Sequence, residues 1–127
     1  MVEVIGTVPE PLHAFAYVSA AAAPFSDRDL SDLLLAVRHA NGALGVTGKL
    51  VVLEGPTGIV RFAQYVEGPR PGLAAAVRRI LADPRHGDFE VRLSGPVAAR
   101  RFEGWDMALH PASAAAFGRE SALVTLG

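Results

Sequence analysis

Residues 55–66 read Gly55-Pro56-Thr57-Gly58-Ile59-Val60-Arg61-Phe62-Ala63-Gln64-Tyr65-Val66, a turn followed directly by a strand pattern. Glycine, proline and threonine supply the turn chemistry over 55–58. Residues 59–66 are rich in β-branched and aromatic side chains and predict a strand. Residues 49–53 predict a second strand just before the turn, so the two strands form a hairpin. The remaining elements are arranged around this hairpin.

A strand and a helix are predicted on the N-terminal side of the hairpin. Residues 13–19 alternate bulky and small side chains, which indicates a strand with two different faces, and Pro24 then interrupts the chain. Ser26 is a good N-cap, with Asp29 completing a partial capping box. The helix that follows carries one apolar face and is expected to end near Asn41-Gly42, where glycine can adopt the left-handed cap.

A helix and two strands are predicted on the C-terminal side. Gly68-Pro69 opens the helix, which has apolar residues at helical spacing and is closed by Asp83-Pro84. Residues 89–93 predict a fourth strand. Residues 105–109 predict a fifth strand, ended by Pro111 and followed by a short helix from Ser113.

This β-α-β-β-α-β order with an added fifth strand predicts an α+β fold of the ferredoxin-like type, with both helices on one face of the sheet. We expect the first and third strands to be parallel neighbours at the centre of the sheet. Tyr17 and Gln64 then become neighbours in space although they are far apart in the sequence.

Composition limits the possible functions of the 127-residue chain. It has no cysteine, which excludes disulfides and thiolate metal sites, and its formal net charge of −1 makes nucleic acid an unlikely partner. The four histidines lack the spacing of metal ligands, so no metal site is predicted. No signal peptide or spanning segment is readable, and we expect a cytoplasmic protein that does not bind membranes. The domain is expected to cover residues 1–110, with its core starting near residue 12, and residues 111–127 to form a short cap or tail.

Side-chain parity places a polar amide inside the core. Phe62, Gln64 and Val66 share one strand face, whereas Arg61 and Glu67 lie on the other. Because charges belong outside, we expect the helices to cover the Gln64 face. An unpaired buried amide costs about 1–3 kcal/mol, so Gln64 needs polar neighbours.

Two neighbours are available. Tyr17 offers a hydroxyl, and Asn41 offers a second amide at the end of the first helix. Neutral hydrogen-bonding groups around a gap between two helices suit a flat heterocycle better than acid–base chemistry. The paired arginines Arg78-Arg79 and Arg100-Arg101 are interpreted as solvated faces.

Two other functions fit the same topology. An RNA-recognition module also uses aromatic residues on its first and third strands, but the net charge and the missing glycines argue against it. An acylphosphatase-like enzyme needs a phosphate-cradling loop after the first strand, and residues 20–24 do not resemble one.

Taken in order, five stretches resemble the BLUF family, which are blue-light sensors using flavin adenine dinucleotide. They are Leu12-His13-Ala14-Phe15-Ala16-Tyr17-Val18-Ser19, Asn41 leading to Gly45-Val46-Thr47-Gly48, Phe62-Ala63-Gln64-Tyr65-Val66-Glu67-Gly68, Asp83-Pro84-Arg85-His86, and Arg101-Phe102 through Trp105-Asp106-Met107. They span roughly residues 12–110. The family has the ferredoxin-like fold, with its flavin between the two helices.

The resemblance implies a role for each matching residue. Tyr17 is similar to the redox-active tyrosine of the family and Gln64 to its switching glutamine. Asn41 resembles the asparagine that binds the flavin edge. The other matching positions are the ring-packing residues Leu33 and Leu50, the ribityl-phosphate contacts Arg85 and His86, and the signal-relay pair Trp105 and Met107.

The implied function is light sensing without turnover of a substrate, so the chain is not expected to be an enzyme. Light would drive electron and proton transfer from Tyr17 to the flavin, and Gln64 would then settle in a new hydrogen-bond arrangement. The expected cofactor is FAD, with FMN as an alternative. We expect a separate downstream protein as the partner and a homo-oligomeric state. Ala40, the long hairpin and the short C-terminal cap depart from the usual family pattern.

Overall fold

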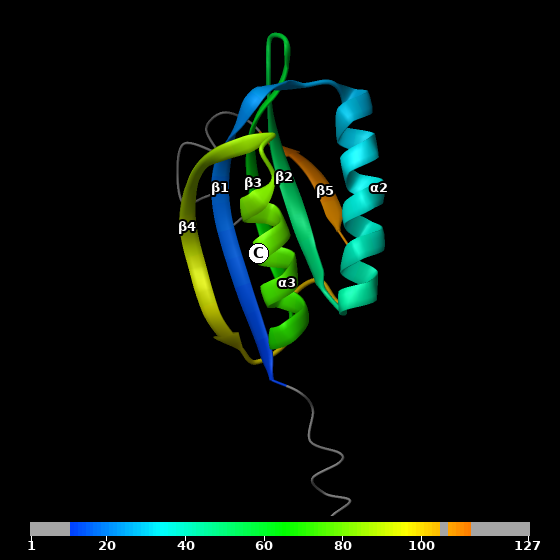
Figure 1. Cartoon of the computed structure of the whole chain (residues 1–127), viewed down its shortest axis with the longest axis vertical. Helices are drawn as coiled ribbons and strands as arrows, with labels where there is room; N and C mark the ends of the chain where they lie inside the picture. Colours follow the sequence, from blue (N-terminus) through cyan, green and yellow to red (C-terminus); the bar gives the residue numbers. More distant parts are fainter. Residues whose placement is uncertain (1–10, 105–106, 113–127) are drawn as a thin grey trace, which may run out of the picture.

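The computed structural model describes residues 11–104 and 107–112 and shows one mixed sheet with two helices (Figure 1). In chain order the elements are β1 (Leu12–Phe25), α2 (Asp27–Leu44), β2 (Thr47–Gly55), β3 (Gly58–Pro69), α3 (Arg70–Ala82), β4 (His86–Val97) and β5 (Ala108–Ala112). The predicted α+β order is confirmed.

The strands lie in the order β4-β1-β3-β2-β5. β1 and β3 are central neighbours as expected, but they are antiparallel, and the predicted parallel pairing was wrong. The reason is topological: α2 returns the chain so that β2 runs in the direction of β1, and the hairpin then reverses β3. Tyr17 pairs directly with Gln64 in this register, which confirms their predicted proximity.

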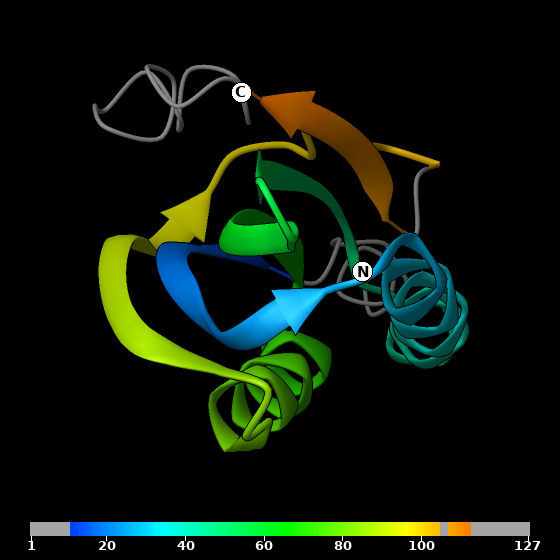
Figure 2. The same cartoon turned by 90° about the horizontal axis from the view of Figure 1, so that it is seen from above.

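Both helices cover the same face of the sheet (Figure 2). The larger core lies on this face and joins Leu30 and Leu34 of α2, Leu73 of α3, and the strand residues Phe62 and Val66. The predicted side-chain parity of β3 is therefore confirmed for the face that carries Gln64.

The ends of the first two elements differ in part from the prediction. The capping box of Ser26 and Asp29 is present at the start of α2. The helix, however, ends at Leu44, because Gly45 adopts the left-handed conformation (φ 70°) and its N–H reaches the carbonyls of Asn41 and Gly42. β1 also runs past Pro24 to Phe25, after an irregularity in its pairing with β3.

On the opposite face of the sheet, the expectation that the charged side chains lie outside is wrong for Glu67. Glu67 on β3 is fully buried there. Its carboxylate accepts hydrogen bonds from the backbone N–H groups of Arg101 and Phe102 at 2.8 Å each, and from the Thr47 hydroxyl at 3.0 Å. These three donors explain how the charge is accommodated in the interior.

Arg100 is also more than a solvated side chain. Its guanidinium donates to the Thr47 hydroxyl at 2.9 Å and to the Gly45 carbonyl at 2.8 Å. The guanidinium of Arg101 lies over the ring of Tyr65, 5.3 Å from its centroid. The segment after β4 is thus fastened to the back of the sheet.

β5 pairs in parallel with β2, from Lys49↔Ala108 to Leu53↔Ala112. It starts later than predicted and includes Pro111, so it reaches two residues into the segment predicted as a tail. Trp105 and the helix predicted from Ser113 lie outside the described residues. Among the helices that the structure describes, none has the length and apolar character needed to cross a bilayer.

We predict that Gly72→Ala weakens the fold. A Cβ at residue 72 would lie 2.1 Å from the Leu44 carbonyl oxygen, where the end of α2 meets the first turn of α3. The two helices must separate to admit it, and the free energy of unfolding should fall by about 1–3 kcal/mol. Urea denaturation measures the change. Gly87→Ala is the control, since its Cβ meets nothing within 4 Å; equal stability of the two variants would contradict the prediction.

Candidate functional site

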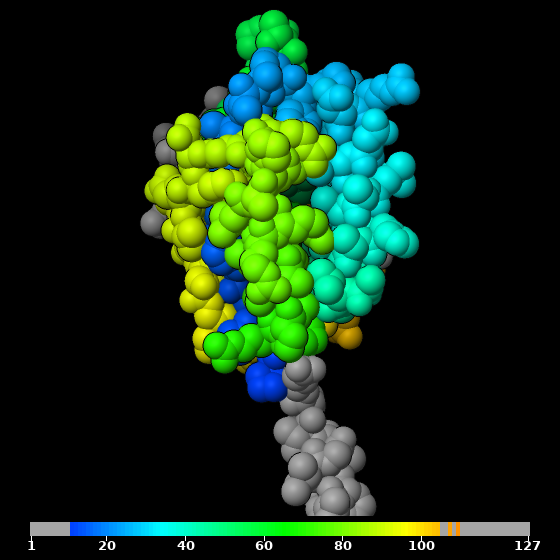
Figure 3. All heavy atoms as spheres, viewed as in Figure 1, coloured from blue at the N-terminus to red at the C-terminus, as the bar shows by residue number. Residues whose placement is uncertain are grey.

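A cleft opens between α2 and α3 above the centre of the sheet, and the hollow between the helices is visible in Figure 3. It contains about 720 Å³ of empty space, part of it open to solvent. Six predicted site residues line it: Tyr17, Leu33, Leu50, Gln64, Arg85 and His86.

Tyr17 and Gln64 form the polar floor of the cleft. The Tyr17 hydroxyl donates to Gln64 Oε1 at 2.5 Å, and the two residues are only 2% and 5% exposed. Burial raises the pKa of Tyr17 well above its ordinary value of 10.0, the negative charge of Asp83 raises it further, and Arg79 opposes both effects. The phenol therefore stays neutral and remains a hydrogen-bond donor.

The other end of the Gln64 amide reaches Met107. Gln64 Nε2 donates to Met107 Sδ at 3.6 Å, and the Met107 side chain is buried. Tyr17, Gln64 and Met107 thus form one chain of contacts from β1 through β3 to the residue that precedes β5. The position of Trp105, the other predicted relay residue, lies outside the described residues.

Asn41 is fully buried on α2 and is not among the residues that line the cleft, but Arg79 joins it to the cleft. Arg79 lies on α3, lines the cleft, and donates from Nη2 to Asn41 Oδ1 at 2.8 Å. Desolvation lowers the pKa of Arg79, and Tyr17 partly offsets this shift. The interpretation of Arg79 as a solvated residue was wrong, because its side chain links the two helices.

Helical spacing could have indicated that Arg79 is not fully solvated, although not which residue it bonds. Ala76 and Ile80 are buried, so a residue three positions after the first and adjacent to the second borders the covered face of α3. Arg78, by contrast, is exposed. The two neighbouring arginines therefore have different surroundings, which their sequence alone did not distinguish.

The walls of the cleft are apolar. Leu33 and Val37 contribute from α2, Leu50 from β2 and Ile80 from α3. Leu50 is 5% exposed. These aliphatic side chains offer an apolar surface to a flat molecule, and the packing roles of Leu33 and Leu50 on a flavin ring stay predictions.

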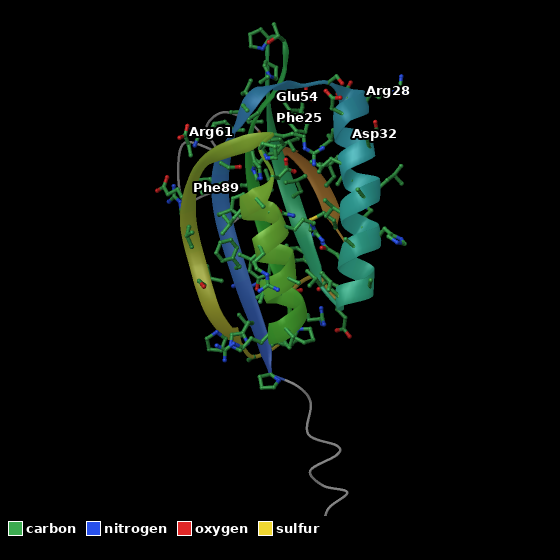
Figure 4. All side chains as sticks on the ribbon, viewed as in Figure 1. Phe25, Arg28, Asp32, Glu54, Arg61 and Phe89 are labelled. Carbon is green, nitrogen blue, oxygen red and sulfur yellow. The ribbon has the colours of Figure 1, made fainter. Side chains whose placement is uncertain are left out.

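His86 stands beside Tyr17 within an aromatic group. Its ring centroid is 5.9 Å from that of Tyr17 and 4.7 Å from that of Phe89 on β4 (Figure 4). His86 Nε2 lies 3.0 Å from the Ile80 carbonyl oxygen, which can only accept, so Nε2 carries a proton. In the neutral ring Nδ1 is then the acceptor for the Ser19 hydroxyl, at 2.8 Å.

The mouth of the cleft carries a cation. Arg85 forms an ion pair with Asp83 at 2.6 Å, and its side chain is 51% exposed. Hydrogen bonds from Arg85 are the main reason that the pKa of Asp83 lies below its ordinary value. The Arg85 guanidinium also lies 5.9 Å from the ring centroid of Phe25, which closes β1 (Figure 4).

Apolar walls, a phenol and an amide at the floor and an arginine at the mouth fit a flavin, which has a flat heteroaromatic ring and, in its nucleotide forms, a phosphate. Within residues 11–104 and 107–112 no three His, Asp or Glu side chains gather where they could hold a metal ion. Fold and cleft together define an α+β module that is built to bind a planar heterocycle.

The family model described as "BLUF: Sensors of blue-light using FAD" matches residues 12–108. This range covers most of the chain, and the protein therefore belongs to the BLUF family of flavin-binding blue-light sensors.

Curated relatives agree with this assignment. The chain is 31% identical over 91 residues to the photoactivated adenylate cyclase subunit beta of Euglena longa, a match that covers 72% of this chain and 10% of that protein. It is 32% identical over 89 residues to the corresponding subunit of Euglena gracilis, covering 70% and 10%. The chain thus spans about a tenth of the length of these relatives.

Solved structures are similar over most of the chain. The dark-state structure of the BLUF protein BlrB is 34% identical, with a TM-score of 0.69, and covers 80% of this chain and 74% of that one. Klebsiella pneumoniae BlrP1 with FMN and cyclic diGMP is 30% identical, with a TM-score of 0.68 and coverage of 79% and 26%. Both agree with the ferredoxin-like fold.

Burial of Tyr17 predicts a specific loss of stability in alkali. Above about pH 10 the unfolded phenol loses its proton while the folded one keeps it, so the unfolded state binds fewer protons and stability falls as the pH rises. Between about pH 9 and about pH 11 the protein should lose roughly 1.4 kcal/mol more than Tyr17→Phe. Urea denaturation at both pH values measures this, and parallel losses in the two proteins would refute the burial argument.

Proposed function

We propose that this chain is a blue-light photoreceptor that binds FAD in the cleft between α2 and α3, with FMN as the alternative, and that Tyr17 and Gln64 are its photochemical residues. The observation that carries the proposal is the buried chain of contacts from the Tyr17 hydroxyl through the Gln64 amide to Met107. Membership in the BLUF family supports it.

Three groups of residues would hold the flavin. Asn41 would hydrogen-bond the edge of the ring, and Arg79 fixes the orientation of its amide by occupying Oδ1. Leu33 and Leu50 would pack on the ring from the walls. Arg85 at the mouth, and His86 beside Tyr17, would contact the ribityl-phosphate end.

A bound flavin supplies the chromophore and, when excited by light, an acceptor for one electron. Tyr17 is the donor in this proposal. A phenol that loses an electron becomes a strong acid, and the first base within its reach is Gln64 Oε1, at 2.5 Å. The proton therefore passes from the Tyr17 hydroxyl to the Gln64 amide.

Gln64 is the bistable element. In the arrangement described, Oε1 accepts from Tyr17 and Nε2 donates to Met107. When both the electron and the proton return to Tyr17, the amide can settle in a second hydrogen-bond arrangement, by rotation or by tautomerisation. The two arrangements differ by about 1–3 kcal/mol of hydrogen bonding, which is small enough for a reversible switch.

Met107, together with Trp105, would carry the change in the amide to the edge of the sheet at β5. We propose that the signal then passes to a separate downstream protein and that the chain works as a cytoplasmic homo-oligomer. Relatives named photoactivated adenylate cyclases support a signalling output for this class of domain. The sensor itself turns over no substrate.

The decisive test is an absorption spectrum of the purified protein before and after blue illumination. We expect a yellow protein whose flavin band moves slightly to the red in the light, because the rearranged amide gains a hydrogen bond to the flavin. Tyr17→Phe should keep the yellow colour and lose the shift, since phenylalanine has no hydroxyl proton to give. A light-induced shift of normal size in Tyr17→Phe would defeat the assignment. Chromatography of the released flavin separates FAD from FMN.

Neighbouring arginines allow a matched test of the binding site. Arg79→Leu removes the donor on Asn41 Oδ1 and should weaken flavin binding by roughly tenfold, the effect of losing a hydrogen bond to a charged group. Arg78→Leu changes an exposed neighbour and should bind as the unchanged protein does. Fluorescence titration of the flavin-free proteins gives both dissociation constants. Equal affinities would show that Arg79 plays no part in binding.

A further inference from the structure

Met107 is held at two atoms by two different elements. Its sulfur accepts from Gln64 Nε2 on β3 at 3.6 Å. Its backbone carbonyl accepts from Arg38 Nε on α2 at 3.0 Å. The side chain that meets the amide and the backbone that leads into β5 are therefore fixed by separate partners.

The two contacts differ in strength. A thioether sulfur is a weak acceptor, and 3.6 Å is a long contact even for sulfur. The contact from Arg38 is charge-assisted, and such hydrogen bonds are stronger than neutral ones. Of these two hydrogen bonds, the one from Arg38 is thus the stronger restraint on Met107, whose side chain is also packed in the larger core.

The carbonyl of Met107 lies directly before the point where β5 joins the sheet. The next residue, Ala108, is the first of β5 to pair with β2, opposite Lys49. α2 runs alongside this edge of the sheet (Figure 1). A hydrogen bond at Met107 therefore sets where β5 begins relative to α2.

Arg38 also lies close in sequence to a residue of the cleft. It precedes Asn41 by three positions, within one helical turn of α2, and Asn41 is joined to Arg79 across the cleft. One short part of α2 therefore bonds both to α3 and to the start of β5.

We propose that Arg38 is a positioning residue that keeps Met107 against Gln64 and thereby couples the amide to α2 and β5. The proposal rests on the proposed function, since it assigns to Arg38 a part in the switch. After the amide has rearranged, the return to the dark arrangement requires Met107 Sδ to be in place to accept from Gln64 again. Arg38 keeps it there and so speeds the return.

The sequence contains two methionines, Met1 and Met107, which makes a direct measurement possible. Protein labelled with ¹³C at the methionine methyl groups gives two signals, and Met107→Leu assigns them. The methyl signal of Met107 reports the surroundings of its side chain, which a change confined to overall stability would not move.

Three variants test the role of Arg38. Arg38→Leu removes the donor. Arg38→Gln keeps an N–H at the same covalent position as Nε but lacks the charge. Arg28→Leu is the control, because Arg28 is an exposed arginine near the other end of α2 and points away from the cleft (Figure 4). Circular dichroism checks that each variant is folded, as expected for changes at the surface of a helix.

We expect Arg38→Leu to move the dark-state Met107 methyl signal and to slow dark recovery after blue light by roughly threefold or more, as loss of a charge-assisted hydrogen bond implies. Arg28→Leu should keep the signal in place and recover at close to the normal rate, and Arg38→Gln, whose N–H donor is neutral, should lie between Arg38→Leu and the unchanged protein. An unchanged Met107 signal in Arg38→Leu would overturn the proposal. So would an equal effect of Arg28→Leu, because the loss of any arginine from α2 would then be enough and the contact with Met107 would not be responsible.

Failure of the proposed function is distinguishable from failure of this proposal. If the unchanged protein shows no light-induced shift, the photoreceptor assignment fails and the part of Arg38 in a switch fails with it. If the unchanged protein responds to light but Arg38→Leu matches it in methyl signal and recovery rate, only the role of Arg38 is refuted.

Discussion

The hydrogen bond between the Tyr17 hydroxyl and Gln64 Oε1 depends on the register of the two central strands. In the observed register these residues are direct partners, and both face the helices. A slip of one residue would turn Gln64 to the opposite face of the sheet, because side chains alternate along a strand. The apolar partners Phe62 and Val66 on the same face prevent such a slip, so the hydrophobic core holds the polar pair in place.

β3 carries a second buried polar residue, Glu67, and both Gln64 and Glu67 contact the segment between β4 and β5. Glu67 faces the back of the sheet and holds the backbone at Arg101 and Phe102, whereas Gln64 faces the front and contacts Met107. The segment between β4 and β5 is thus anchored to β3 from both faces. In the proposed mechanism, a rearrangement of the front contact would move the start of β5 while the back contact stays in place, which would localise the signal at the edge of the sheet.

The sequence patterns correctly predicted features that depend on residues close together in the chain. The capping box at Ser26, the turn at 55–58 and the parity of β3 depend on neighbouring residues, and all agree with the structure. The direction of β3 relative to β1 follows from the number of chain reversals between them, and the predicted parallel pairing counted these reversals wrongly. The burial of Glu67 and the bond from Arg79 to Asn41 come from partners distant in sequence, which no single pattern could reveal.

In the proposed mechanism, a weak partner at Met107 allows the Gln64 amide to switch. Its oxygen meets a hydroxyl donor and its nitrogen meets a sulfur acceptor, so the surroundings favour one orientation. A carbonyl or carboxylate in place of the sulfur would bind the N–H groups strongly and lock the amide. An aliphatic side chain there would leave a buried donor unpaired and favour neither orientation. A thioether sulfur is an acceptor of intermediate strength. Because Arg38 holds the backbone of Met107, we expect the sulfur to release the amide while Met107 keeps its position.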